Sequence, residues 1–158
     1  MPRIAPHPTD AQFAHAYSDA WTSDPDGLIE FFTPDGTYTD VAMGTTYAGR
    51  DGILRFHRWM LKFAPDSAIR FYDAVAGDGV AYLEWSWSGS IDGPLRLPGG
   101  GSLDAAGRHF DATGIAACRY NGDGKLTSHR DFWDVGLLVD QLGHRLVAVT
   151  DAASVAAR

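Results

Sequence analysis

The sequence contains one cysteine, Cys118, and only 13 basic residues against 20 acidic ones in 158 residues. A single cysteine excludes an internal disulfide framework and a cysteine-rich metal site. The net charge of -7 argues against nucleic acid and membrane surfaces as partners, because both bind clustered lysine and arginine. No hydrophobic run approaches membrane-spanning length, and the Pro-rich start lacks the core of a signal peptide. We therefore expect a cytoplasmic protein.

Several common catalytic motifs are also missing. The chain has no phosphate-binding glycine loop, no Gly-x-Ser-x-Gly elbow and no His-Glu-x-x-His zinc helix. His129 and Asp131 have the spacing of two metal ligands, but no third ligand stands at a usable distance. The sequence therefore predicts a site that uses no metal and no cofactor.

Aromatic residues, by contrast, are abundant, with five Trp, six Tyr and eight Phe. A chain of this length is expected to form one domain with a substantial core. So many large rings fit either a heavily packed core or a cavity with aromatic walls.

The first part of the chain has helical patterns. Thr9 and Gln12 match a capping box, which predicts a helix over 9–22. A second, short helix is expected from Pro25, and a third over 50–63 with Phe56 and Met60 on its hydrophobic side.

The rest of the chain has strand patterns. One short strand is expected at 37–41 after a Pro-Asp-Gly turn, and residues 92–107 are predicted to be a long loop that serves as a lid or as a plain surface excursion. Glycine turns separate the four longer strands, which are expected at 68–76, 80–91, 108–120 and 125–134.

This order of elements predicts an α+β fold. A bent antiparallel sheet should form a cone that packs on three N-terminal helices and encloses a central pocket. The single domain is expected to span residues 1–143, closing with a short helix at 135–142, and residues 144–158 are expected to be a loosely attached tail.

Residues 125–134 carry the clearest functional signal. Strand alternation places His129, Asp131 and Trp133 on one face. An imidazole, a carboxylate and an indole on one face are more typical of a wet pocket than of a core. Asp131 is therefore our first candidate for a catalytic acid or base, with a salt bridge to Arg130 or another neighbour, or a solvated sheet rim, as the structural alternative.

The string Arg130-Asp131-Phe132-Trp133-Asp134, together with helices followed by a bent sheet over about residues 9–143, resembles the ketosteroid-isomerase-like superfamily, also called nuclear-transport-factor-2-like. The nearest branches are the SnoaL-like polyketide cyclases and the limonene epoxide hydrolases. The resemblance implies a conical α+β fold with a central pocket. Members of such a fold have many activities.

The resemblance also implies roles for single residues. Tyr17 falls where ketosteroid isomerases have an oxyanion-binding tyrosine, and Asp40 where they have the general base. The third isomerase position, a protonated aspartate, falls on Ala116. Tyr38 with Asp40 matches a Tyr-x-Asn pair of epoxide hydrolases, whose Arg and second Asp fall on Trp85 and Trp87. His129 and Asp131 resemble the acid/base pair of SnoaL-like cyclases.

Each candidate also has a structural alternative. Asp40 is as well explained by a capping role near the following turn, and Tyr17 by a place in the core. Trp85 and Trp87 form either core or a pocket wall for a planar substrate, to which we assign Trp133, Ala116, Phe56 and Met60 as well. Cys118 is interpreted as a small core residue, and the histidines at 57 and 109 as surface or interface residues.

We therefore expect a cofactor-independent acid/base enzyme for a hydrophobic, carbonyl-bearing small molecule. Its reaction would be a cyclisation, an isomerisation or an elimination. The alternatives are a module that only binds a hydrophobic ligand or a partner, and an epoxide-opening enzyme. We also expect a homodimer, formed through a convex sheet face that includes Ile115, Ala117 and Phe132.

Overall fold

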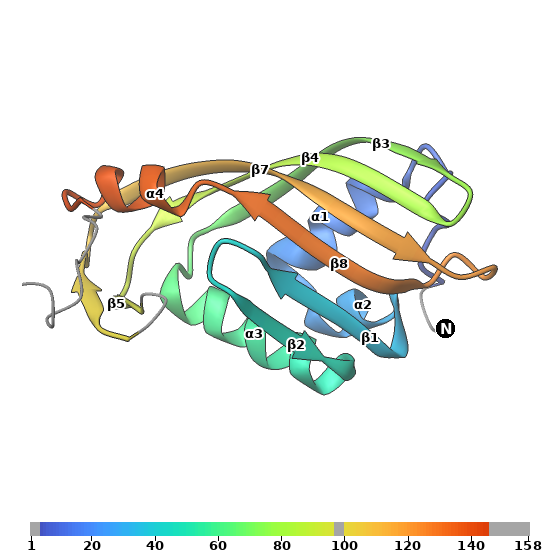
Figure 1. The fold of residues 1–158 in the computed structure, drawn as a ribbon, viewed down its shortest axis with the longest axis horizontal. Coiled ribbons are helices and arrows are strands. Elements are labelled where there is room, and N and C mark those ends of the chain that lie inside the picture. The colour runs from blue at the N-terminus through green and yellow to red at the C-terminus, as the bar shows by residue number, and fades with distance from the viewer. Residues whose placement is uncertain (1–3, 97–99, 146–158) are drawn as a thin grey trace, which may run out of the picture.

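A computed structural model describes residues 4–96 and 100–145. There, a bent six-stranded sheet curves over the helices, and a two-stranded hairpin stands at one end (Figure 1). In chain order the elements are α1 (Phe13–Ser23), α2 (Pro25–Ile29), β1 (Phe32–Asp40), β2 (Thr45–Ala48), α3 (Gly49–Phe63), β3 (Ala68–Gly77), β4 (Val80–Ser90), β5 (Pro94–Arg96), β6 (Ser102–Asp104), β7 (His109–Tyr120), β8 (Leu126–Trp133) and α4 (Val135–Gln141). The predicted α+β fold is confirmed.

The sheet has the strand order β2-β1-β8-β7-β4-β3. The four strands predicted over residues 68–134 pair antiparallel, as expected. β1 joins them in the parallel direction beside β8, and β2 pairs antiparallel with β1. The parallel pairing brings a strand from the start of the chain alongside the last strand of the sheet.

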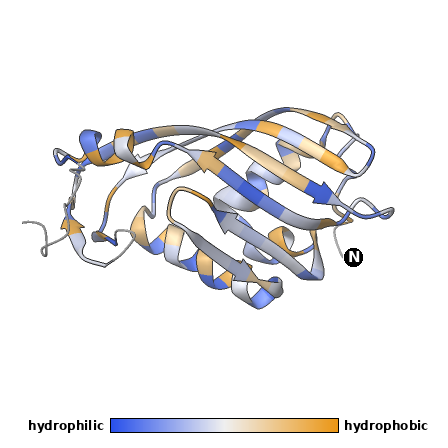
Figure 2. Cartoon of the chain, viewed as in Figure 1, coloured by the Kyte–Doolittle hydropathy of each residue, from blue (hydrophilic) through white to orange (hydrophobic). Residues whose placement is uncertain are grey.

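The helices pack on the sheet through one hydrophobic face. Hydrophobic and hydrophilic residues are interspersed along α3, as in an amphipathic helix (Figure 2). Its buried residues include Ile53, Phe56 and Met60, and α3 packs against β1 while α1 packs against β3. In the described part of the chain, no helix combines the length and the apolar character needed to cross a bilayer.

The helix starts follow local chemistry. Pro25 opens α2, and the Asp24 carboxylate accepts a hydrogen bond from the backbone N–H of Gly27, as an N-cap does. The capping box at Thr9 was a wrong prediction. The Thr9 hydroxyl bonds to the His7 ring instead, and α1 begins only at Phe13.

Three further expectations need correction. The strand predicted at 37–41 begins at Phe32, so the expected turn at 34–36 lies within β1, where the register to β8 shifts. β2 was not predicted. The expected loop 92–107 contains the β5–β6 hairpin. Of the predicted tail 144–158, all but the first two residues lie outside the described residues.

Candidate active site

The candidate site lies where β1 and β8 run side by side. Their register pairs Tyr38 with His129 and Asp40 with Asp131. Strand alternation turns all four side chains to the same side of the sheet, and all four residues are buried. The parallel pairing of two segments about ninety residues apart therefore brings a tyrosine, an imidazole and two carboxylates together in one place.

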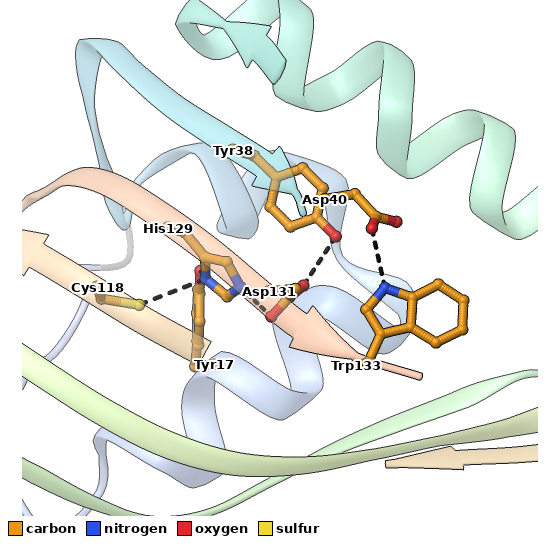
Figure 3. Close-up of polar contacts among 7 residues, drawn as sticks. All are labelled: Tyr17, Tyr38, Asp40, Cys118, His129, Asp131 and Trp133. Atoms are coloured by element: carbon orange, nitrogen blue, oxygen red, sulfur yellow. Dashed lines mark hydrogen bonds and ion pairs between the residues drawn. The ribbon is translucent and has the colours of Figure 1, made fainter. Parts of the chain in front are cut away.

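Tyr38, His129 and Asp131 form one hydrogen-bonded network with Tyr17 of α1 (Figure 3). The Tyr17 hydroxyl lies 2.9 Å from Nδ1 of His129, and Nε2 of His129 lies 2.7 Å from Oδ1 of Asp131. The Tyr38 hydroxyl donates to Oδ2 of Asp131 over 2.8 Å. Asp131 is thus held on both oxygens, and each oxygen keeps a second lone pair.

The electrostatics of this hydrogen-bonded network favour an ion pair between His129 and Asp131. Burial opposes the charged form of His129, but the adjacent Asp131 carboxylate outweighs it and raises the pKa of His129 to about 10. Burial also raises the pKa of Tyr17 and of Tyr38 well above their ordinary values, so both remain hydroxyls at neutral pH. A hydroxyl can donate to a neutral Nδ1 or accept from a protonated one, so Tyr17 suits both states of His129.

Asp40 does not take part in this hydrogen-bonded network. Its Oδ1 accepts hydrogen bonds from the indole N–H of Trp133 at 2.9 Å and from the backbone N–H of Met43 at 3.0 Å. Burial raises the pKa of Asp40, and the nearby Asp131 charge acts in the same direction against these two donors. The site therefore contains two carboxylates with different surroundings, one paired with an imidazolium and one bound by neutral donors.

Both carboxylates line one cavity, part of which opens to solvent. Every tryptophan of the chain contributes to its wall. The lining residues are Trp21, Tyr38, Asp40, Met43, Phe56, Trp59, Met60, Ile69, Phe71, Trp85, Trp87, Leu95, Asp131, Trp133 and Leu138. A hydrophobic concave site with a few converging polar groups is the usual form of a small-molecule site.

A glycine on β7 shapes the aromatic wall. Gly114 pairs with Trp85 of β4 on one side and with Trp133 of β8 on the other. A Cβ atom at Gly114 would lie 2.4 Å from Cζ2 of Trp85. The Trp85 ring therefore occupies the place that a side chain at position 114 would take, directly over the β7 backbone.

Most predicted site residues meet at this cavity. Besides the two carboxylates, the predicted residues that line it are Tyr38, Phe56, Met60, Trp85, Trp87 and Trp133. His129 is fully buried behind Asp131. Tyr17 and Ala116 are also fully buried, and neither is among the lining residues.

Of the structural alternatives for Asp131, the salt bridge to a neighbour is found, but its partner is His129 and not Arg130. Arg130 points to the other face of the sheet, where its guanidinium lies 4.9 Å from the centre of the Phe132 ring. Asp131 pairs with His129 instead and is 8% exposed, so it is neither bridged to Arg130 nor part of a solvated rim.

Other residues were interpreted wrongly or missed. His57 is no surface residue, since it is fully buried and bonds to the backbone oxygen of Trp21 at 2.9 Å. Cys118 is a core residue as expected, but its sulfur lies 3.5 Å from Nδ1 of His129. Sequence reasoning did not place several lining residues at the pocket: Trp21, Met43, Trp59, Ile69, Phe71, Leu95 and Leu138.

The residues that the structure describes include no group of three His, Cys, Asp or Glu side chains arranged to hold a metal ion. His129 uses its Nε2 atom for Asp131 and shares its Nδ1 atom with Tyr17. Both ring nitrogens of His129 are therefore engaged by neighbouring side chains.

Comparisons with known proteins agree with this architecture. A family model for the SnoaL-like domain matches residues 13–129. A protein with a ketosteroid isomerase-like fold from Catenulispora acidiphila DSM 44928, solved in complex with trimethylamine, is 24% identical with a TM-score of 0.67, and the match covers 82% of this chain and 91% of that chain.

Two further solved structures share the fold. AclR from Streptomyces galilaeus, named as a hydroxylase, is 19% identical with a TM-score of 0.64, and the match covers 90% of this chain and 85% of that one. A protein from Jannaschia sp. CCS1 named as a SnoaL-like polyketide cyclase is 15% identical with a TM-score of 0.66. The match covers 81% of this chain and 87% of that one. At these identities the likeness shows the fold alone. No curated protein matches the chain.

Proposed function

The chain belongs to the SnoaL-like domain family, and from this premise we propose that it is a cofactor-independent acid/base enzyme for a hydrophobic, carbonyl-bearing small molecule. The observation that carries the proposal is the position of Asp131. Its carboxylate lines an aromatic cavity and is held between the His129 imidazole and the Tyr38 hydroxyl. A carboxylate held in a fixed position in a largely apolar site is suited to remove a proton.

The proposed reaction begins with proton abstraction. Asp131 takes a proton from the carbon beside the substrate carbonyl, and the electron pair of that C–H bond moves to the carbonyl oxygen, which gives an enolate. Once Asp131 is protonated, it needs the Tyr38 hydrogen bond less. The Tyr38 hydroxyl then becomes available to donate to the enolate oxygen, where charge develops.

The second half of the reaction decides the product. Return of the Asp131 proton to another carbon gives an isomer. Attack of the enolate carbon on a carbonyl carbon of the same molecule forms a carbon–carbon bond and gives a ring, and the alkoxide oxygen formed from that carbonyl takes the proton from Asp131. Loss of a leaving group from the next carbon gives an alkene, with Asp131 protonating the departing group. Each outcome restores the carboxylate of Asp131 without an oxidant, a reductant or a cofactor.

His129 is a positioning residue in this proposal. It is fully buried behind Asp131 and reaches no cavity space, so it acts on the substrate only through Asp131. Its Nε2 atom holds one oxygen of Asp131 in place, and Tyr17 fixes the ring from the other side.

A cavity lined mainly by aromatic and aliphatic side chains also supports a second candidate, a module that binds a hydrophobic ligand without catalysis. Deuterium exchange in D2O into the carbon beside the carbonyl of 2-tetralone separates the two. The enzyme should exchange this position faster than buffer, and Asp131→Asn should lose the exchange while tryptophan fluorescence still reports tetralone binding. Binding by the wild type without any exchange would support the binding module instead.

A further inference from the structure

The cavity combines a large aromatic surface with carboxylates as its only charged groups. All five tryptophans line it, together with Tyr38, Phe56 and Phe71. Among the described residues, Asp40 and Asp131 are the only charged lining residues, and no lysine, arginine or histidine accompanies them. Such a site presents negative charge and aromatic ring faces to a ligand, and both attract a cation.

The two carboxylates are not equally compensated. His129 balances the charge of Asp131 from behind. Asp40 accepts hydrogen bonds only from neutral groups, the Trp133 indole and the Met43 backbone, and within residues 4–96 and 100–145 no cationic side chain lies at ion-pair distance from it. A buried carboxylate without a cation is unfavourable, and the Asp131 carboxylate on the adjacent strand adds repulsion. The cavity therefore retains one uncompensated negative charge.

Aromatic rings surround the same carboxylate. The Trp133 indole is bonded to Asp40 and meets Trp85 edge to face, with ring centres 6.4 Å apart. Tyr38, two residues before Asp40, is stacked on Phe56 with ring centres 4.4 Å apart. The faces of such rings attract cations, most strongly where water is excluded.

We propose that the natural substrate carries a positively charged nitrogen, as an alkylated ammonium group, which Asp40 and the surrounding rings bind. An alkylated group fits better than a primary ammonium, because the lining supplies few acceptors for three N–H donors and many apolar contacts for alkyl groups. The inference rests on the proposed function for the role of Asp131 as acid/base. It gives Asp40 a different task, that of anchoring the charge.

Choline and 3,3-dimethylbutan-1-ol provide a matched pair of probes, since they share shape and hydroxyl group and differ in the charged nitrogen. Isothermal titration of the wild type should show choline binding more tightly by about tenfold or more. Asp40→Asn should bring the two affinities close together. Asp73→Asn, which removes an exposed carboxylate on β3, should leave the preference intact. Equal affinities in the wild type, or an unchanged preference in Asp40→Asn, would overturn the proposal.

Two further variants keep the result interpretable. If Asp40→Asn does not fold, Trp133→Leu should weaken choline binding more than alcohol binding, and an unchanged preference there would also overturn the proposal. Asp131→Asn should retain the choline preference, because His129 loses its charge along with its partner and Asp40 stays. If the wild type shows this preference but exchanges no deuterium into 2-tetralone, the acid/base function fails and the cation site stands.

Discussion

The Nε2 atom of His129 lies 2.7 Å from Oδ1 of Asp131, although only one residue separates the two on β8. Side chains two residues apart on a strand start about 7 Å apart, so these two must lean toward each other. Tyr17 contacts the opposite nitrogen of the imidazole and fixes this orientation. The result is a rigid pair whose carboxylate end faces the cavity and whose imidazole end is sealed in the core.

This pair should make stability depend on pH above neutrality. The pKa of His129 is raised from 6.5 to about 10, so its stabilising contribution is complete below pH 6.5 and is lost as the pH rises through about 10. The free energy of unfolding of the wild type should therefore fall relative to that of His129→Gln across this range. Denaturant unfolding at several pH values measures it. A difference that stays constant between neutral pH and about pH 10 would contradict the ion pair.

Asp40 should cost stability at neutral pH. Burial raises its pKa above 3.8, so the folded state holds this proton more tightly than the unfolded state. The stability of the wild type should therefore decrease as the pH rises through the raised pKa, and Asp40→Asn should raise the melting temperature at neutral pH by about 2 °C or more. Asp73→Asn is the matched control and should leave it unchanged. A lower melting temperature of Asp40→Asn would show that the bonds from Trp133 and Met43 outweigh burial.

Gly114 should tolerate no side chain. In Gly114→Ala the new Cβ would meet Cζ2 of Trp85 at 2.4 Å and the backbone oxygen of Phe132 at 2.7 Å. Overpacking of this kind costs about 1–3 kcal/mol, and displacement of Trp85 should also weaken ligand binding in the cavity. Gly122→Ala is the control, because a Cβ there meets no atom within 4 Å. Thermal unfolding of both variants tests the difference, and equal stability would mean that the Trp85 ring moves freely.

We propose a homodimer formed through the convex face of the sheet. Ile115 on β7 and Phe132 on β8 are register neighbours on this face and are 46% and 41% exposed. Sedimentation at micromolar concentration should therefore show a dimer, and Ile115→Glu should shift it to a monomer, because a carboxylate would be buried without a partner. Leu137→Glu changes an exposed leucine on α4 and should leave the dimer intact. A monomeric wild type would contradict the proposal.

Much of the fold could be predicted from local patterns. Alternation and glycine turns located β3, β4, β7 and β8, and amphipathic spacing located α3, because each signal lies within one element. The pairing of β1 with β8 could not be found in this way. It joins residues about ninety positions apart, and the Pro34-Asp35-Gly36 segment has the composition of a turn although it lies in a strand.

In the site, too, local patterns located some residues and missed those whose position depends on tertiary packing. His129, Asp131 and Trp133 were located because one strand presents all three on one face. Trp21 and Trp59 reach the cavity from helices, and their direction depends on how α1 and α3 pack on the sheet. His57 was assigned to the surface or an interface, yet it is buried in the core, where its Nε2 bonds to the Trp21 backbone oxygen and its Nδ1 has no hydrogen-bond partner among the described residues.

The central claim is that Asp131, and not Asp40, takes the proton from the substrate. The measurement that tests it most directly is the rate of deuterium exchange into 2-tetralone by the wild type, Asp131→Asn and Asp40→Asn, followed by proton NMR. Asp131→Asn should lower the rate by about a hundredfold or more, as loss of a positioned base does, and Asp40→Asn should lower it by less than about tenfold. The opposite ranking would contradict the claim and assign the base to Asp40.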